Sequence, residues 1–400
     1  MSNIKSTLFE TFCLQGLFLD GIENRDNGTF LKVRSPRNSA ICPHCSVSAK
    51  KVHKKYHRTI KHMICNDKIV FLNLTIRCFK CKLCKYIFRE SISGISSKRT
   101  SEHFRLSAVK KIKDRCFASV ASEYNISSSS LINDAVHIFN NTKINWPDKN
   151  FSLGIDEHSF SGRDFVITIT DLTNHKLLAI LPDDRQTTLR KFLKNIPKNA
   201  KDLIISVCTD MKQSYRTVIE KELNKSIHVI DKFHVIQFFN RQLHELRTLY
   251  SSHKFPLPKQ LLEKNKENLN HEEKKVLRAI FNRYQPLEEL WRMKEIIRKM
   301  YRCKNPDKAK MFYEAMLEGL QFDNRLIWKS IYKTMNRWKD PILNYFESRI
   351  TNAYTEGVHT KIKLLKRMSY GFRNKANYIA KMSLAFMPIA ALFESFYHQV

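Results

Sequence analysis

The sequence predicts a mixed α/β protein of several domains, and three observations support this prediction. Four of its cysteines form two Cys-x-x-Cys pairs near the N-terminus, a pattern typical of a small metal-binding domain. From residue 151 to residue 230, short apolar runs alternate with helical patterns, as in an α/β domain. The stretch 235–345 is charged and helix-periodic throughout, which indicates a long helical insertion.

The composition is that of a folded chain with a polyanionic partner. Apolar residues make up 42% of the 400 residues and aromatic residues 11%, enough for two or three domains with real cores. Only 9 Gly and 11 Pro argue against collagen-like and turn-dense all-β classes. Lys and Arg number 70 against 38 Asp and Glu, a formal net charge of +32, which indicates nucleic acid or an anionic membrane.

The membrane is the weaker of these two interpretations. The best apolar run, Leu384–Phe393, is far shorter than the roughly 18 residues of a membrane helix. The first ten residues lack the basic-then-apolar order of a signal peptide. We therefore expect a cytoplasmic protein whose partner is DNA or RNA.

The two cysteine pairs, at residues 42–45 and 81–84, predict one structural zinc ion. Four thiolates on two tight turns suit tetrahedral zinc and leave no position for water or substrate. Phe88 is expected to pack beneath the second turn. Cys78 and His44 are alternative ligands, and a cluster of metal-free core cysteines is the alternative to a metal site. The predicted ligands are Cys42, Cys45, Cys81 and Cys84.

Between the pairs, residues 50–62 carry six Lys or Arg and no acid. Such a run is often a solvated surface, but beside a zinc site in so basic a chain we expect it to contact DNA phosphates. Residues 1–98 are thus predicted to form a zinc-binding domain, with a strand at Ile69–Ile76. The side chains expected to contact phosphate are Lys54, Lys55, Arg58 and Lys61.

Residues 101–142 are predicted to form helices interrupted by a turn at Ser127–Ser130. Ala121 is small enough for close helix packing, Ile126 can anchor the turn, and Ser127 can cap the second helix. The pattern favours a helix-turn-helix over 99–145, whose second helix would enter the major groove. An ordinary helical hairpin is the alternative. The side chains expected to face the bases are Ser128, Ser129 and Asn133.

The larger domain, expected over 150–400, has the element order of an RNase H-like domain. Three strands are followed by a helix, a strand, a helix and a strand, and a helical insertion follows at about 240–345. Trp291, Trp328 and Trp338 fall at helical spacing and are expected in the core of the insertion. The predicted strands are Phe151–Asp156, Phe165–Asp171, Lys176–Leu181, Asp202–Thr209 and Ile227–Ile230.

Three carboxylates of this domain are candidate metal ligands. Asp156 and Asp210 each end a predicted strand, and adjacent strands would bring them together, whereas Glu157 would point to the other face. Glu356 is the only acidic residue between 348 and 393, and a basic helix follows it. Converging carboxylates suit two Mg²⁺ (or Mn²⁺) ions that clamp a phosphodiester. Each one alone is equally compatible with a helix cap or a surface charge.

At these residues the sequence resembles the ISL3 family of insertion-sequence transposases. Segments 155–163, 209–215 and 351–374 resemble the three catalytic segments of the family, and the last is the most specific. Asp231-Lys-Phe-His234 resembles its Asp-Arg-Phe-His segment, with Lys for Arg. The cysteine pairs resemble its N-terminal zinc-binding domain. One departure is His359, where the family pattern has Asn, and it concerns the contacts near Glu356.

The resemblance implies a DDE-type transposase that uses Asp156, Asp210 and Glu356 to cut DNA and to join its 3′-hydroxyl end to a target. It implies two Mg²⁺ or Mn²⁺ ions and double-stranded DNA partners, namely terminal inverted repeats and target DNA. It also implies a homodimer or larger assembly, associated with the bacterial nucleoid. Asp231 and His234 would support the ligands or contact DNA; a strand-end cap and a core histidine are the alternatives. Basic residues expected to bind DNA after Glu356 are Lys363, Lys366, Arg367 and Arg373.

Two rival functions belong to other classes. A non-catalytic zinc-finger and helix-turn-helix regulator would leave the three carboxylates and the large domain that holds them unexplained. An RNase H-like nuclease or resolvase would cut DNA without joining the 3′-hydroxyl end to a new duplex. An assay that maps both cleaved and joined strands separates these functions.

Overall fold

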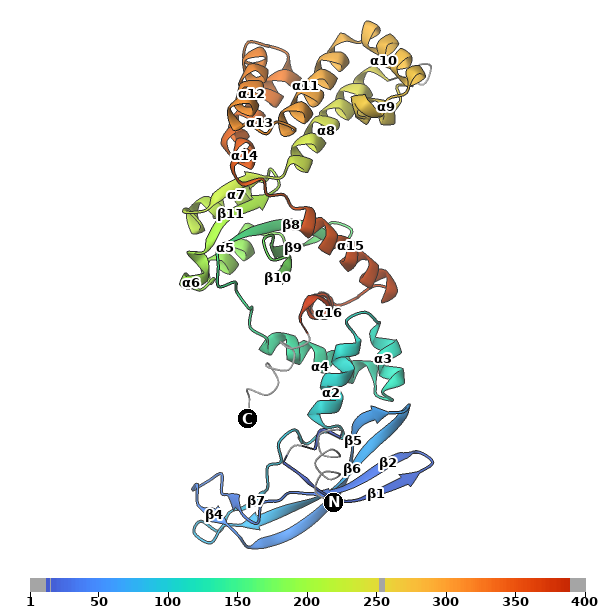
Figure 1. The fold of residues 1–400 in the computed structure, drawn as a ribbon, viewed down its shortest axis with the longest axis vertical. Helices are drawn as coiled ribbons and strands as arrows, with labels where there is room; N and C mark the ends of the chain where they lie inside the picture. The colour runs from blue at the N-terminus through green and yellow to red at the C-terminus, as the bar shows by residue number, and fades with distance from the viewer. Residues whose placement is uncertain (1–11, 15, 252–255, 389–400) are drawn as a thin grey trace. The chain divides into compact units, whose positions relative to one another are not determined.

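The computed structural model describes residues 12–14, 16–251 and 256–388, which form two compact units (Figure 1). Unit 1 comprises residues 1–143 and 362–400, and unit 2 comprises residues 144–361. Each unit has its own hydrophobic cores. None of the helices in the described part of the chain combines the length and apolar character of a membrane span.

Unit 1 begins with a five-stranded sheet of order β1-β2-β6-β5, in which β7 also pairs with β6. The predicted strand Ile69–Ile76 is confirmed and lies within β6, whose alternate side chains Val70, Leu72 and Leu74 fill the core. The hairpin between β5 and β6 turns at Asn66 and Asp67, both with positive φ, as a tight two-residue turn requires. The bounds are β1 Phe18–Arg25, β2 Gly28–Arg34, β5 Val52–Cys65, β6 Lys68–Lys80 and β7 Ile87–Arg89.

Three helices follow: α2 (Glu102–Lys111), α3 (Phe117–Glu123) and α4 (Ser128–Asn141). The predicted cap is confirmed, since the Ser127 hydroxyl accepts a hydrogen bond from the Ser130 amide at 3.2 Å. The turn predicted at Ser127–Ser130 was placed too late, because residues 124–126 form the turn and α4 already begins at Ser128. Ala121 is buried, as expected, and Ile126 packs against the same core. Helix α16 (Lys375–Phe386) joins this core through Leu384, a packing that the sequence does not indicate.

Unit 2 is built on a sheet of order β10-β9-β8-β11-β12. Strands β8, β9 and β10 form an antiparallel meander, and β11 runs parallel to both β8 and β12. The predicted order of strands and helices is confirmed. The bounds are β8 Phe151–Ser161, β9 Asp164–Asp171, β10 Lys176–Leu181, α5 Gln186–Lys194, α6 Lys198–Lys201, β11 Ile204–Thr209, α7 Gln213–Glu222 and β12 Ile227–Ile230.

One strand end was predicted wrongly. Strand β8 does not stop at Asp156 but continues to Ser161, because beyond Gly154 it still pairs with β9 in a hairpin although it no longer pairs with β11. Because the residues after Asp156 are polar, a prediction based on apolar runs could not detect that the strand continues. Asp156 therefore lies inside a strand, at the point where β8 leaves its parallel neighbour.

The stretch 235–345 is helical, as predicted (yellow to orange in Figure 1). Trp291, Trp328 and Trp338 are at most 8% exposed and belong to its core, as predicted. A last long helix, α15 (Ala353–Met368), begins in unit 2. The helices of the insertion are α8 Lys232–Tyr250, α9 Lys259–Glu263, η1 Lys266–Asn268, α10 His271–Arg283, α11 Gln285–Tyr301, α12 Pro306–Gln321, α13 Leu326–Leu343 and α14 Tyr345–Ser348.

Candidate functional site

The two cysteine pairs lie on equivalent turns. The first follows β3 (Ala40–Ile41) and precedes β4 (Ser48–Ala49), and the second joins β6 to β7. In each turn the residue after the second cysteine, Ser46 or Lys85, has a left-handed backbone, with φ of 57° and 61°. This conformation turns the chain back so that both cysteines of a pair point to the same side.

The four predicted sulfur atoms lie within 4.8 Å of one another. Cys42 Sγ is 3.6 Å from Cys84 Sγ, and Cys45 Sγ is 3.5 Å from Cys81 Sγ. Four zinc–sulfur bonds of about 2.3 Å in a tetrahedron separate the sulfurs by roughly 3.8 Å, so the cluster is compatible with one structural zinc ion.

The two alternative ligands are directed elsewhere. Cys78 is buried opposite Arg89 in the β6–β7 pairing, and the His44 ring stacks on Tyr86 with centroids 5.8 Å apart. Phe88 packs against the cluster, as predicted.

The protein favours a thiolate at one cysteine of the cluster. Backbone hydrogen bonds, first from Cys84 and then from Leu83, lower the pKa of the Cys81 thiol to about 7, although burial opposes them. Once one thiolate has formed, a second one nearby is disfavoured unless a cation is present. The donor set therefore fits a bound divalent metal better than four free thiols.

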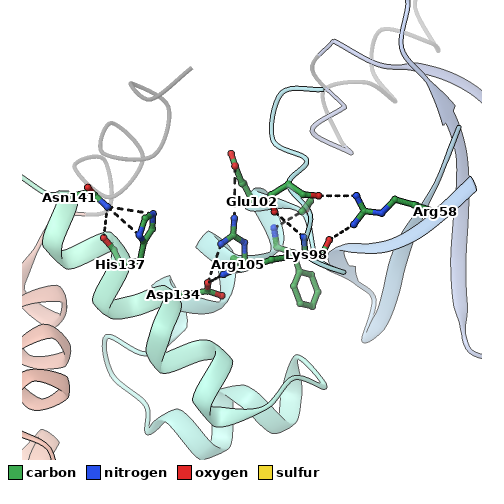
Figure 2. A network of polar contacts seen from close by, with 10 residues as sticks. Arg58, Lys98, Glu102, Arg105, Asp134, His137 and Asn141 are labelled. Atoms are coloured by element: carbon green, nitrogen blue, oxygen red, sulfur yellow. Dashed lines mark hydrogen bonds and ion pairs between the residues drawn. The ribbon is translucent and has the colours of Figure 1, made fainter. Parts of the chain in front are cut away.

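Part of the basic run on β5 makes hydrogen bonds within the protein (Figure 2). The Arg58 guanidinium donates hydrogen bonds to the carbonyl oxygens of Ser96, Ser97 and Lys98 at 2.7–3.0 Å. The Lys61 ammonium donates to the carbonyl of Asn125, in the turn between α3 and α4. Both side chains thus fix segments of unit 1.

The other two basic residues predicted on β5 are exposed. Lys54 lies over the Tyr56 ring at 4.9 Å, and Lys55 is also at the surface. These two side chains are the better placed of the four to reach phosphates.

Helix α4 is fixed on one side and exposes polar residues on the other. Asp134, 2% exposed, binds the Arg105 guanidinium at 3.1 Å and the Lys98 ammonium at 2.7 Å (Figure 2). The side chains predicted to face bases, Ser128, Ser129 and Asn133, are all exposed in the first half of α4. A buried ion pair therefore holds the helix that would meet DNA.

The basic residues predicted after Glu356 are at the surface. Lys363, Arg367 and Arg373 are exposed, and Lys366 is half-buried.

Two of the predicted catalytic carboxylates lie on neighbouring strands in the middle of the unit 2 sheet, near the carboxyl end of β11. Asp156 is 9% exposed and lies opposite Thr168 in the β8–β9 pairing. Asp210 follows β11 directly, and β11 runs beside β8 with Cys208 opposite Gly154. The third, Glu356, is an exposed residue in the first turn of α15.

The start of α15 is fastened to β8 by buried contacts. The amide of Asn352 donates to Asp231 Oδ2 at 3.1 Å, and its side-chain amide donates to the carbonyl of Ile155 at 3.4 Å. The hydroxyls of Thr355 and Thr170 are 2.7 Å apart. Glu356 therefore follows directly after Thr355, whose side chain makes a buried contact with the sheet that carries Asp156.

Gly154 makes this contact possible, and sequence reasoning missed it. A Cβ atom there would lie 2.5 Å from Thr170 Oγ1 and 2.7 Å from Thr355 Oγ1, closer than real contacts allow. A glycine inside a buried strand often marks such a close approach, and this signal could have revealed the site. Asn352 and Thr355 carried no comparable signal.

The carboxylates influence one another electrostatically. Burial raises the pKa of Asp156 to about 6, and the negative charges of Asp210 and Asp231 add to this effect. Burial also raises the pKa of Asp210 and of Glu356, the latter with a contribution from Asp231. His234 lowers the pKa of all three predicted ligands.

This arrangement fits oxygen coordination of a divalent cation. Asp210 Oδ1 is buried and accepts no hydrogen bond from the described residues. An added cation would satisfy that oxygen and relieve the repulsion among the carboxylates. In the part of the chain that the structure describes, however, the four cysteines are the only group of three or more potential ligands that has already converged.

His359 lies directly beside Asp156. Its Nδ1 is 3.7 Å from Asp156 Oδ2, its Nε2 is 3.0 Å from the Thr168 hydroxyl, and its ring packs on His158 with centroids 4.6 Å apart. The residue that departs from the family pattern thus ties α15 to β8 and β9, one turn after Glu356.

Glu157, the neighbour of Asp156, contacts residues at the start of α7. It accepts hydrogen bonds from the Lys212 ammonium and the Tyr215 hydroxyl. Lys212 also lies 3.5 Å from Asp184. Burial and the Glu157 carboxylate hold the pKa of the Tyr215 hydroxyl well above its usual range, so the hydroxyl keeps its proton and donates a hydrogen bond to Glu157.

Asp231 and His234 have different positions. Asp231 is 2% exposed and caps α8, since its Oδ1 accepts from the Phe233 amide at 3.1 Å. His234 is half-buried and lines a cavity beside Asp210. Asp231 therefore supports the start of both α8 and α15.

Comparisons with known proteins relate the chain to transposases. The family model DDE_Tnp_ISL3, described as a transposase, matches residues 153–382, which is more than half of the chain. The chain is also similar to the transposase for insertion sequence element IS1001 of Bordetella parapertussis. The two are 20% identical over 361 residues, which cover 86% of this chain and 88% of that relative.

Proposed function

Because the chain belongs to the ISL3 family of transposases, we propose that it binds the ends of its insertion sequence and catalyses cleavage and strand transfer of DNA. One observation supports this function above the others. Asp156 and Asp210 lie on the neighbouring strands β8 and β11, and buried contacts fasten to this region the helix that carries Glu356. A regulator that only binds DNA has no need for Asp156 and Asp210, two carboxylates that repel each other on neighbouring strands.

We interpret unit 2 as an RNase H-like domain with a helical insertion. The antiparallel meander β8–β10, followed by parallel β11 and β12, supports this interpretation. In such a sheet the carboxyl end of β11 and the middle of β8 present their side chains to the same region. The insertion between β12 and α15 brings Glu356 back to the sheet from more than a hundred residues away.

Asp156, Asp210 and Glu356 would hold two Mg²⁺ or Mn²⁺ ions. When bound, such ions activate the attacking oxygen and stabilise charge on the phosphate and the leaving oxygen. Asn352 and Asp231 hold the start of α15, and His234 offsets part of the carboxylate charge. Burial keeps bulk water from the Asp156 carboxylate.

Unit 1 would recognise the terminal inverted repeats. The zinc-held turns would fix the sheet, and α4 would present Ser128, Ser129 and Asn133 to the major groove. Lys54, Lys55 and the exposed basic residues after Glu356 would contact phosphates. Because two DNA ends must be cut and joined together, we expect the chain to act as a homodimer or larger assembly on DNA.

The decisive experiment uses the purified full chain, Mg²⁺ and a duplex that carries the element's terminal repeats. Strand mapping should show cleavage at the repeat ends and covalent joining of the new 3′-hydroxyl to a second duplex. Binding without cleavage would support a regulator instead. Cleavage without joining would support a nuclease.

A further inference from the structure

A polar cavity of about 470 Å³ lies next to Asp210 in unit 2. Strand β11 ends at its border, helix α8 forms one wall, and α9 contributes side chains from the opposite side. Side chains that line it and matter for the argument are Asp210, His234, Gln237, Asn240, Arg241 and Lys259.

The wall formed by α8 is a stripe of hydrogen-bonding side chains. His234, Gln237 and Arg241 follow one another at intervals of three and four residues, so they lie on one face of the helix. Gln237 and Arg241 are exposed, and the Arg241 guanidinium lies 5.7 Å from the Phe238 ring. The stripe therefore extends from the carboxylate site along the helix.

Two acceptors at this cavity lack hydrogen bonds. Asn240 Oδ1 and Asp210 Oδ1 are buried without a partner among the described residues. A buried acceptor without a partner is costly unless a ligand satisfies it. For Asp210 a cation is the natural ligand, whereas the amide of Asn240 requires a hydrogen-bond donor.

We propose that this cavity binds one unpaired nucleotide of the DNA strand beside the scissile phosphate. The inference rests on the proposed function and specifies its substrate conformation. Amide and guanidinium side chains are those that pair with base edges. Lys259, which lies 3.7 Å from Glu263 in the same cavity wall, would exchange this partner for the attached phosphate. The volume falls within the range of small-ligand sites, roughly 300–1,000 Å³, and admits a single nucleotide rather than a base pair with both backbones.

The position of the cavity beside Asp210 explains how a bound nucleotide would help the reaction. Extruding a base moves the backbone on either side of it, and enzymes use this to bring a reacting group out of the duplex. Here the base would occupy the α8 stripe while the adjoining phosphate approaches Asp210. Binding energy from the base would thus hold the scissile phosphate at the carboxylates.

The first test places 2-aminopurine at the nucleotides on either side of the cleavage site in terminal-repeat duplexes. The full chain is added with Ca²⁺ in place of Mg²⁺, so that fluorescence is read without cleavage. A rise at one of these positions, and none in the middle of the repeat, is expected for the wild type. Arg241→Ala and Gln237→Ala should each remove most of that rise while the complex still forms.

The second test compares cleavage of fully paired and mismatched ends with Mg²⁺. Arg241→Ala should slow cleavage of paired DNA roughly tenfold, the size of one good base contact. A mismatch at the extruded position removes the cost of unpairing, so the defect should shrink to about threefold or less. Arg337→Ala, which removes an exposed arginine of α13 outside the cavity, should cleave both duplexes like the wild type.

The outcomes separate this proposal from the proposed function. Cleavage by the wild type without any 2-aminopurine rise overturns the nucleotide pocket and leaves the transposase intact. Equal defects of Arg241→Ala on paired and mismatched DNA also overturn it, because they indicate a phosphate contact only. A rise without cleavage supports the pocket and counts against the transposase.

Discussion

The cysteine cluster of unit 1 and the carboxylate site of unit 2 are assembled in opposite ways. Each cysteine pair is closed by its own turn, and the four sulfur atoms already lie within 4.8 Å of one another. The carboxylates come from β8, from the end of β11 and from α15; Asp210 raises the pKa of Asp156, and Asp231 raises the pKa of both Asp156 and Glu356. The cysteine cluster is thus complete in the fold itself, whereas the proposed catalytic site keeps unsatisfied charge for its ligands and substrate.

The largest effect should come from changing a carboxylate. Asp210→Asn keeps the shape of the side chain but removes the charge of an oxygen that has no partner among the described residues. Because the predicted ligands act as one unit, both cleavage and joining should fall by roughly 10³-fold or more. DNA binding should persist or strengthen, since one negative charge near phosphate is lost.

Strand mapping and gel-shift titration measure these two effects separately. Asp202→Asn is the matched control, because Asp202 is an exposed aspartate near the other end of the same strand. Asp156→Asn and Glu356→Gln should behave like Asp210→Asn. An active Glu356→Gln enzyme would contradict the proposed triad and turn attention to Asp231 or Glu347.

Removing the metal from the cysteine cluster should damage only unit 1. Purified chain should contain about one zinc ion, and Cys45→Ser or a chelator should cost several kcal/mol of stability in residues 40–90. Hydrogen exchange should then rise in that region while residues 151–230 keep their protection. Cys13→Ser, an exposed cysteine outside the cluster, should retain zinc. Equal loss of protection in both units would contradict the prediction that the metal stabilises unit 1 alone.

The difference between the sites also explains what could be predicted from the sequence. The clustering of the four cysteines follows from their spacing, and the strand and helix order of unit 2 follows from apolar periodicity. The docking of α15 depends on Gly154, Asn352 and Thr355, which meet only after the chain has folded. Polar residues after Asp156 concealed the true end of β8. Contacts between distant segments leave no local pattern, so that part of the site required a structure.

The third prediction concerns the ion pair that holds α4. Asp134 and Arg105 are both less than a tenth exposed, so Asp134→Ala removes the nearer carboxylate of the buried Arg105 and leaves Glu102 at 3.9 Å. The cost should be about 2–3 kcal/mol in the free energy of unfolding of the helices of unit 1, below that of a fully unpaired buried charge. Denaturant titration followed by hydrogen exchange measures it.

A surface pair in the same unit is the control for this test. Asp20→Ala breaks the exposed pair between Asp20 and Arg34 and should cost about 1 kcal/mol or less. Equal costs for the two variants would show that burial does not strengthen the pair beside α4. At protein concentrations that saturate the DNA, both variants should cleave it at the wild-type rate.

A mildly acidic pH should lower the stability of both units, whereas chelation of the metal should lower that of unit 1 only. Burial lowers the pKa of His62 and of His228 to about 4, against 6.5 for an unburied histidine. The unfolded chain therefore binds protons that the folded chain does not between these values, so stability is full above pH 6.5 and falls as the pH drops toward 4. The loss is on the order of 3 kcal/mol per histidine at most.

Matched glutamine variants identify the histidine responsible in each unit. Hydrogen exchange at pH 7 and pH 5 should show a weaker pH response of unit 1 in His62→Gln and of unit 2 in His228→Gln. The zinc-loaded wild type is the reference for both, because thiolate protonation would otherwise add to the response of unit 1. An unchanged response in both variants would exclude these residues as the cause.

The smallest effect should come from His359, and it tests how firmly the carboxylate site is held. His359→Ala removes the 3.0 Å hydrogen bond to Thr168 and the side chain beside Asp156, while Glu356 remains one turn away. Since α15 keeps its contacts through Asn352 and Thr355, the helix should stay docked but less firmly. We expect the cleavage rate to fall roughly tenfold, the effect of about 1.4 kcal/mol, with unchanged DNA affinity and a higher Mg²⁺ requirement. His359→Asn restores the residue expected in the family and a side chain able to hydrogen-bond Thr168, so it should recover most of the rate. If Asn rescues nothing, or if the Mg²⁺ requirement stays that of the wild type, His359 contributes only to packing, and α15 is held by its first turn alone.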